Sequence, residues 1–347
     1  MAESPLLTQK GAHMTQHEQT APQLPADTQR SAASERPAPA FLSRNPAIHD
    51  ILSTIALIAN SPASVLITGE SGTGKEVIAQ YIHSCSSRAA QPFIAINAAA
   101  LPKDVIDNEL FGHEKEAFTG AISKKAGCFE MADRGTLFLD EIAEMHPQTQ
   151  AKLLRAIETK VFRRLGGKEE VCVDARVIAA TNKNVAQAIR DGEFREDLFY
   201  RLSVIELVIP PLRSRREDIP LLANHFLAFF GRKYGQEDKV FSPESMELMT
   251  AFDWPGNVRE LRNLIEGLML ICPDGMITPR YLPERITKMK PAAPMLTIPL
   301  GTTLESVEQL VIRETLASVE QNKSAAAKIL GISRKTLHNK LNALDRP

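Results

Sequence analysis

The chain has 347 residues, of which 44% are hydrophobic and 5% aromatic, and its formal net charge is −1. This length allows two or three domains with buried cores, and the charge excludes a molecule that is basic as a whole, so any nucleic-acid surface must be local. Four scattered cysteines form no CxxC pair, and no apolar run reaches the roughly 18 residues of a membrane helix. We therefore expect a cytoplasmic protein with reduced thiols.

Residues 1–40 contain no aromatic side chain and are rich in Ala, Gln, Pro, Ser and Thr. Such a segment cannot bury enough apolar surface to offset the entropy lost on ordering. The composition predicts a disordered N-terminal tail.

Strand-like and helix-like runs alternate over residues 41–212. Gln148–Glu158 is typical of the helical runs, with Leu153, Leu154 and Ile157 spaced for one face. Five strands are predicted, at Val65–Thr68, Phe93–Ile96, Thr136–Leu139, Arg176–Ala180 and Val204–Val208. This alternation predicts an α/β core with a parallel sheet between helices.

A glycine-rich motif, GESGTGK at residues 69–75, lies between the first strand and a helix-like run, Glu76–His83. Backbone N–H groups of such a turn surround a phosphate, and its lysine adds positive charge to the outer oxygens. An ordinary glycine-rich turn is the alternative, but the spacing, the lysine and both flanks favour a phosphate-binding loop (P-loop). The nucleotide-binding residues expected here are Gly69, Glu70, Ser71, Gly72, Thr73, Gly74, Lys75 and Glu76.

The third predicted strand ends in two acids, Asp140 and Glu141. In a P-loop sheet, an acid at this place can hold Mg²⁺ and its neighbour can orient an attacking water. An apolar strand that ends in Asp-Glu is common by itself. Together with Lys75, it predicts a catalytic nucleotide site with Mg²⁺ at Asp140.

The strand signal fades after residue 212. Ile219–Phe230, Pro243–Phe252 and Asn257–Cys272 have helical patterns. We expect a helical subdomain over residues 213–285 and a linker over 286–303, where Pro, Lys, Met and Gly are mixed.

Residues 304–347 predict a small all-α module with a helix, a glycine turn and a second helix that Ser333 caps. Between 323 and 346 there are six Lys or Arg residues and one acid, an excess of +5, which suits binding in the DNA major groove. A basic, solvated helix pair is the alternative. The candidate DNA contacts are Ser333, Arg334, Lys335, Thr336, Asn339 and Lys340.

The sequence EAFTGA at residues 116–121 resembles the GAFTGA loop of bacterial enhancer-binding proteins. These are AAA+ ATPases that activate transcription by RNA polymerase carrying sigma-54, and the resemblance extends from about residue 41 to the end. Two further motifs support this resemblance. One is GESGTGKE, which has Glu76 where a general P-loop has Ser or Thr, and the other is WPGNVREL at 254–261. The last module resembles a Fis-type helix-turn-helix. The segment before it, Leu304–Ala317, would support a dimer.

The resemblance implies roles for further residues. Phe118 and Thr119 would contact sigma-54. Asn97 would restrain the catalytic Glu141, and Asn182 would sense the γ-phosphate.

Three arginines also acquire roles by resemblance. Arg195 and Arg201 would be arginine fingers that reach the nucleotide of a neighbouring subunit, and Arg259 would contact nucleotide from the lid. Catalysis in trans implies a ring, a hexamer built from dimers. Glu116 departs from the family pattern, which has glycine at this position. Glycine reaches a positive φ without the energetic cost that glutamate has.

The resemblance implies an ATP-driven activator that binds enhancer DNA and remodels the sigma-54 RNA polymerase closed complex into an open complex. Two alternatives remain. One is a DNA-binding repressor with a vestigial ATPase fold or an impaired activation loop, which Glu116 favours weakly. The other is a general AAA+ remodeller. Because only about 40 residues precede the predicted core, we expect control through expression level or a separate regulatory protein.

Overall fold

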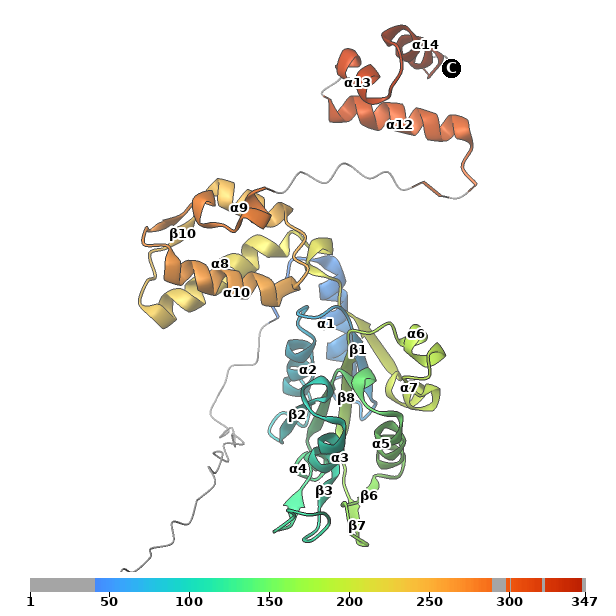
Figure 1. Ribbon diagram of the computed structural model, residues 1–347, viewed down its shortest axis with the longest axis vertical. Helices are drawn as coiled ribbons and strands as arrows, with labels where there is room; N and C mark the ends of the chain where they lie inside the picture. Colours follow the sequence, from blue (N-terminus) through green and yellow to red (C-terminus); the bar gives the residue numbers. More distant parts are fainter. Residues whose placement is uncertain (1–40, 289–297, 300, 320–321, 345–347) are drawn as a thin grey trace, which may run out of the picture. The chain divides into compact units, whose positions relative to one another are not determined.

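The computed structural model describes residues 41–288, 298–299, 301–319 and 322–344. The predicted tail, 1–40, and most of the expected linker lie outside these residues. Figure 1 shows the described elements in chain order. Within them, none of the helices combines the length and apolar character that crossing a bilayer requires.

All five predicted strands are confirmed, and they form one parallel sheet in the order β2-β5-β8-β1-β9. Their bounds are Val65–Thr68 (β1), Phe93–Asn97 (β2), Thr136–Asp140 (β5), Arg176–Thr181 (β8) and Ile205–Val208 (β9). Asn97 is paired with Asp140, and Thr68 with Thr181. The carboxyl ends of these strands therefore meet at one edge, which is where ligands bind in open α/β sheets.

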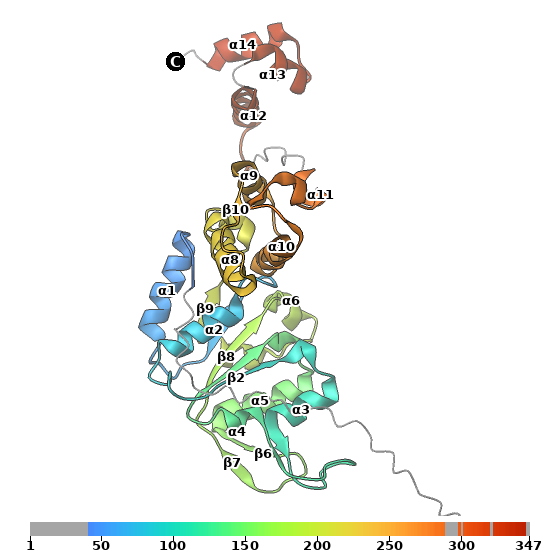
Figure 2. The same ribbon diagram turned by 90° about the vertical axis from the view of Figure 1, so that its left-hand side faces the viewer.

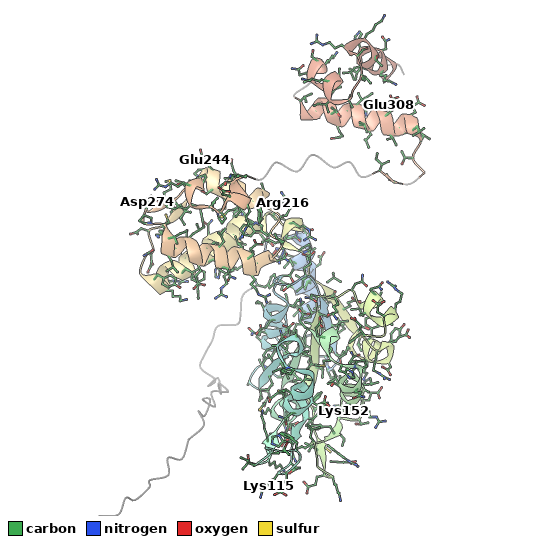
Figure 3. The ribbon with its side chains drawn as sticks, viewed as in Figure 1. Lys115, Lys152, Arg216, Glu244, Asp274 and Glu308 are labelled. Atoms are coloured by element: carbon green, nitrogen blue, oxygen red, sulfur yellow. The ribbon has the colours of Figure 1, made fainter. Side chains whose placement is uncertain are left out.

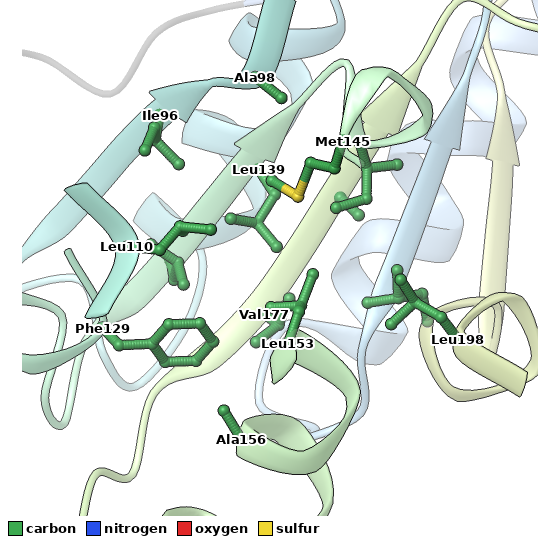
Figure 4. Packing of buried hydrophobic residues seen from close by; sticks show 14 of the residues in the cluster. Ile96, Ala98, Leu110, Phe129, Leu139, Met145, Leu153, Ala156, Val177 and Leu198 are labelled. Atoms are coloured by element: carbon green, nitrogen blue, oxygen red, sulfur yellow. The ribbon is translucent and has the colours of Figure 1, made fainter. Parts of the chain in front are cut away.

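Helices cover both faces of this sheet (Figure 2). They are Pro46–Ile58 (α1), Lys75–Ser84 (α2), Lys103–Phe111 (α3), Cys128–Met131 (α4), Pro147–Thr159 (α5), Val185–Arg190 (α6) and Glu196–Leu202 (α7). Alternate residues of β5 are buried on opposite faces: Leu137 and Leu139 pack with α3, α5 and α7, whereas Phe138 packs with α1 and α2. Figure 4 shows Leu139 and Val177 of the sheet facing Leu153 of α5. Burial on both faces explains the continuous apolar strand runs.

Two short antiparallel pairs extend from the core, and the sequence did not indicate either. They are Gly112–His113 (β3) with Lys125–Ala126 (β4), and Val161–Arg163 (β6) with Glu170–Cys172 (β7). A Cβ at Gly112, where φ is +71°, would lie 2.3 Å from the carbonyl oxygen of Lys125. Only glycine fits this close approach, which closes the base of the loop that contains EAFTGA.

The helical subdomain, or lid, follows β9. Its elements are Asp218–Tyr234 (α8), Val240–Phe241 (β10), Pro243–Ala251 (α9), Asn257–Ile271 (α10), Met276–Ile277 (β11) and Glu284–Thr287 (α11), with 3₁₀ turns at Leu212–Ser214 (η3) and Pro279–Tyr281 (η4). They share a core around Trp254. Ile286 is buried in this core, so the lid continues beyond the expected boundary at residue 285.

The C-terminal module has three helices, Leu304–Ser318 (α12), Lys323–Ile329 (α13) and Arg334–Leu344 (α14). Ile312 and Leu316 of α12 pack with Ala326 and Leu337 in a small separate core. The predicted cap is confirmed, because Ser333 Oγ accepts a hydrogen bond from the Thr336 N–H at 3.0 Å. The helix-turn-helix pair is therefore a packed unit with α12.

Candidate functional site

The P-loop has the glycine geometry that the sequence predicts. Gly69, Gly72 and Gly74 have φ values of +156°, +79° and +105°, which side chains rarely allow. Lys75 is 6% exposed, and its Nζ donates to the Gly69 carbonyl oxygen at 2.9 Å. The loop backbone and the start of α2 thus curve around the lysine ammonium.

The two predicted acids lie beside this lysine. Lys75 Nζ is 3.4 Å from Glu141 Oε1. Glu141 Oε2 also accepts a hydrogen bond from the Asn182 N–H at 2.9 Å. Glu141 has a left-handed backbone, with φ +53°, and this turns its side chain toward both partners. The structure therefore brings Lys75, Glu141 and Asn182 together.

The expected partner of Asn97, Glu141, is not the residue that Asn97 contacts in this structure. Asn97 Nδ2 instead donates to Asp140 Oδ2 at 2.7 Å. The register of β2 on β5 places Asn97 directly beside Asp140, whereas Glu141 has already left the strand in its left-handed turn. Asn97 consequently orients the predicted magnesium ligand.

Burial raises the pKa of Asp140; the positive charge of Lys75 opposes this effect and the negative charge of Glu76 adds to it. Within the described residues, no three His, Cys, Asp or Glu side chains gather as a metal site made by protein alone. Mg²⁺ commonly binds one or two carboxylates together with nucleotide phosphates and water. A single partly desolvated carboxylate beside the P-loop fits that coordination.

Replacing Asp140 with asparagine should raise the melting temperature at pH 7. Because the pKa is raised on folding, the folded chain keeps this proton to higher pH than the unfolded chain. The ionised carboxylate therefore destabilises the fold at neutral pH, and this penalty disappears as the pH falls through the raised pKa of Asp140. Melting temperatures of the parent, Asp140→Asn and the exposed control Asp50→Asn, measured from pH 4 to 8, test this. A pH-independent gain would contradict it.

Lid residues contact the P-loop directly. Arg259 Nη1 donates to Ser71 Oγ at 2.9 Å, which agrees with its expected place beside the nucleotide loop. A cavity of about 400 Å³ adjoins this contact. The cavity is lined by Ser71, Gly256, Arg259, Glu260, Asn263, Leu264 and Arg285.

The sequence reasoning missed two further lid contacts. Arg213 forms a bidentate ion pair with Glu70, at 2.5 and 2.8 Å, and it lowers the pKa of that carboxyl. Asn257 is buried with φ +52°, and its Nδ2 donates to the Ser71 carbonyl oxygen at 3.0 Å. Its position in WPGN, after a proline and a glycine, was the available signal.

The two predicted arginine fingers lie at the ends of α7. Arg195 precedes the helix and pairs with Asp197 at 2.6 Å, and Arg201 is exposed near the other end. Six residues of helix separate them by about 9 Å along the axis. Within the described residues, no hydrogen bond or ion pair joins either arginine to Lys75 or Glu141.

The EAFTGA loop exposes the predicted contact residues. Phe118 is 48% exposed, with its ring edge-on to His113 at 5.0 Å between centroids, and Thr119 is exposed. Glu116 adopts φ +65°, as the comparison with glycine predicted, and its N–H donates to the Ala121 carbonyl oxygen at 2.8 Å. Figure 3 labels the neighbouring Lys115 in this loop. Ile122, which the sequence reasoning missed, is 85% exposed beside it.

Ser333 precedes α14, and the other five candidate DNA contacts lie within the first seven residues of this helix. Five of the six are exposed: Ser333, Arg334, Lys335, Thr336 and Asn339. Lys340 differs, because its Nζ lies 2.6 Å from Glu308 Oε1 of α12. This ion pair joins α14 to α12, so Lys340 has a contact within the module.

Known protein families match three successive parts of the chain. Family models match for a sigma-54 interaction domain at residues 41–208, an AAA+ ATPase lid domain at 213–297, and the Fis family of bacterial regulatory proteins at 303–344.

Three curated relatives are similar over most of the chain. Regulatory protein AtoC of Escherichia coli (strain K12) is 49% identical over 307 residues, or 87% of this chain and 67% of AtoC. From the same organism, transcriptional regulatory protein ZraR is 45% identical (87% of this chain, 68% of ZraR) and DNA-binding transcriptional regulator NtrC is 43% identical (91% and 72%). The chain thus spans about two thirds of the length of these relatives.

A solved structure is also similar. The crystal structure of NtrX from Brucella abortus in complex with ATP matches with a TM-score of 0.66 and 37% identity, over 88% of this chain and 69% of NtrX. An ADP complex of the same protein matches equally well, with a TM-score of 0.66.

Proposed function

Since this chain belongs to the sigma-54 activator family of AAA+ ATPases, we propose that its subunits form a ring in which ATP hydrolysis drives promoter opening. Family membership makes the chain a sigma-54-dependent transcriptional activator and an ATPase. The proposal concerns how its residues perform this activity. The contact of Glu141 with both Lys75 and the Asn182 N–H carries it.

Lys75 and the P-loop amides bind the β and γ phosphates. Asp140 would hold Mg²⁺, and the bound ion would neutralise negative charge on the phosphates. Asn97 keeps the Asp140 carboxylate in place. The γ-phosphate competes with Glu141 for Lys75 and for the Asn182 N–H. Glu141 is thereby released to orient the attacking water.

An exchange of partners by Glu141 also provides a two-state switch. With the γ-phosphate bound, Asn182 contacts nucleotide; after hydrolysis it returns to Glu141. We propose that this movement passes to the loop of Phe118 and Thr119, which engages sigma-54 in one state and withdraws in the other.

The C-terminal module supports binding to enhancer DNA. Its exposed candidate residues make the N-terminus of α14 basic. In helix-turn-helix motifs, the N-terminal residues of the recognition helix contact base edges. Arg195 and Arg201 act across the subunit boundary, so the active form is a ring, and we propose a hexamer assembled from dimers. A separate regulatory protein could control that assembly.

ATP hydrolysis together with open-complex formation by sigma-54 RNA polymerase tests the proposal. Turnover without open complexes would contradict the coupling. A repressor with a vestigial ATPase fold predicts no turnover by the assembled ring, and the close approach of Lys75 to Glu141 argues against it.

Glu116→Gly should increase open-complex formation about two- to tenfold while ATP turnover changes less than twofold. The backbone at 116 has φ +65°, which costs a non-glycine residue about 1 kcal/mol. The Glu116 side chain is 82% exposed, and its Oε1 lies 3.5 Å from Lys115 Nζ. Glu116→Gln removes the charge but keeps the backbone cost, so it separates the two effects. Open complexes counted by heparin-resistant binding measure the result, and indistinguishable activity of all three proteins would remove Glu116 as a tuning residue.

A further inference from the structure

Gln150 is a fully buried polar residue in the first turn of α5, and the sequence reasoning gave it no role. Its Nε2 donates to the carbonyl oxygens of Met145 and Glu193, each at 2.7 Å. Its Oε1 accepts a hydrogen bond from the Arg195 N–H at 2.8 Å. Both donors and the acceptor of this side chain are therefore used on backbone groups.

These three backbone groups belong to two functional segments. Met145 ends the turn that begins at Glu141, whereas Glu193 and Arg195 lead into α7. The side chain of Arg195 is exposed, and among the described residues its ion-pair partner is the nearby Asp197. Its position is consequently set by its backbone, and Gln150 holds that backbone against the turn that follows Glu141.

Lys183 links the same two segments a second time. Its Nζ lies 3.0 Å from Glu193 Oε2 and 3.2 Å from Glu144 Oε1. The hydrogen bond with Glu193 is the main cause of the raised pKa of Lys183, with Glu144 adding to it. Lys183 directly follows Asn182, whose N–H contacts Glu141.

We propose that Gln150 is a positioning residue for Arg195, assisted by Lys183, and that the two couple the state of a subunit's own ATP site to the arginine it offers its neighbour. When Glu141 changes partners, the turn that ends at Met145 shifts, and Gln150 passes the shift to Arg195. The inference rests on the proposed function, because it takes Arg195 to be a finger acting in trans.

Gln150→Met should lower ATP turnover of the assembled ring about 10- to 100-fold, the effect of a displacement near 1 Å in a positioned group. ATP affinity should stay within about twofold, because the hydrogen bonds of Gln150 go to Met145, Glu193 and Arg195 and not to the P-loop. Gln148→Met, the same change at an exposed position two residues earlier on α5, is the matched control and should match the parent. Parent-like turnover of Gln150→Met rings would overturn the inference.

Mixed rings distinguish positioning of the finger from damage to the subunit's own site. Arg195→Ala subunits keep a site without a finger, and Lys75→Ala subunits keep a finger without a site, so mixing them should restore turnover. Adding Gln150→Met to the Lys75→Ala subunit should abolish that recovery, and adding it to the Arg195→Ala subunit should leave it. Equal loss in both placements would overturn the inference.

If Gln150→Met does not fold, Lys183→Met tests the inference instead, added in turn to the Lys75→Ala subunit and to the Arg195→Ala subunit. Its ion pairs are partly exposed, and losing them should leave the fold intact. A selective loss of about threefold or more, seen only in the finger-donating subunit, supports the inference, and no selectivity overturns it. Failure of the proposed function gives a different result from failure of this inference. If Arg195 is not a finger acting in trans, rings made only of Arg195→Ala subunits would hydrolyse ATP.

Discussion

Glu141→Gln should lower ATP turnover by about 10²- to 10⁴-fold, the range expected for loss of a positioned general base, while ATP still binds. The glutamine keeps the shape of the side chain and can still accept a hydrogen bond from the Asn182 N–H. It loses the negative charge that faces Lys75 at 3.4 Å and attracts a proton from water. ATP affinity should therefore be kept or increased, since Lys75 becomes freer to bind phosphate.

Phosphate release by the assembled ring and equilibrium binding of a fluorescent ATP analogue measure the two effects separately. Glu158→Gln, at an exposed position of α5, is the control for losing one acid and should behave as the parent. Turnover within tenfold of the parent would show that another group activates the water. Loss of binding together with turnover would instead mean that Glu141 supports the P-loop.

The main sheet could be predicted from the sequence because its strands are short and largely apolar runs. Burial of β5 on both faces made its run continuous and easy to recognise. The short pairs β3–β4 and β6–β7 could not be predicted, because two or three residues show no periodicity. Their pairing depends on contacts such as the approach of Gly112 to Lys125, which are set only in the folded chain.

The site divides in the same way. Lys75, Asp140 and Glu141 belong to short continuous motifs that lie at or directly after the ends of strands, so their place at the sheet edge could be predicted. The contact of Asn97 with Asp140 could not be predicted, because the choice between Asp140 and Glu141 depends on strand register and on one left-handed residue. Gln150 lies on a strongly helical run, and nothing in that pattern shows a buried amide joined to segments before and after it.

The lid contacts add a physical reason why nucleotide binding reaches beyond the core. Gly72 and Gly256 approach so closely that a Cβ on Gly72 would lie 2.4 Å from the Gly256 carbonyl oxygen. Asn257 and Arg259 add hydrogen bonds to Ser71 in the same loop. A shift of the P-loop on binding phosphate must therefore move the start of α10 or break these contacts.

Arg195→Ala should reduce turnover of the ring by about 10³- to 10⁵-fold, as loss of an arginine finger does in other nucleotide hydrolases. ATP binding by the isolated subunit should not change, because the side chain of Arg195 pairs with Asp197 and with no group of its own subunit's P-loop. Arg195→Lys keeps the charge but loses the planar pair of donors, so it should recover only part of the rate. Arg232→Ala, on the exposed face of α8, is the control.

Ring assembly must be measured beside turnover, since a lost subunit contact would also abolish hydrolysis. Light scattering with a bound ATP analogue gives the mass of the assembly. A full-size ring of Arg195→Ala subunits without turnover supports a catalytic role in trans, and a full-size ring with parental turnover contradicts it. Arg201→Ala in the same assay separates the contributions of the two arginines, which lie about 9 Å apart along the helix. The variant with the larger loss of turnover at unchanged ring mass identifies the arginine that contributes more.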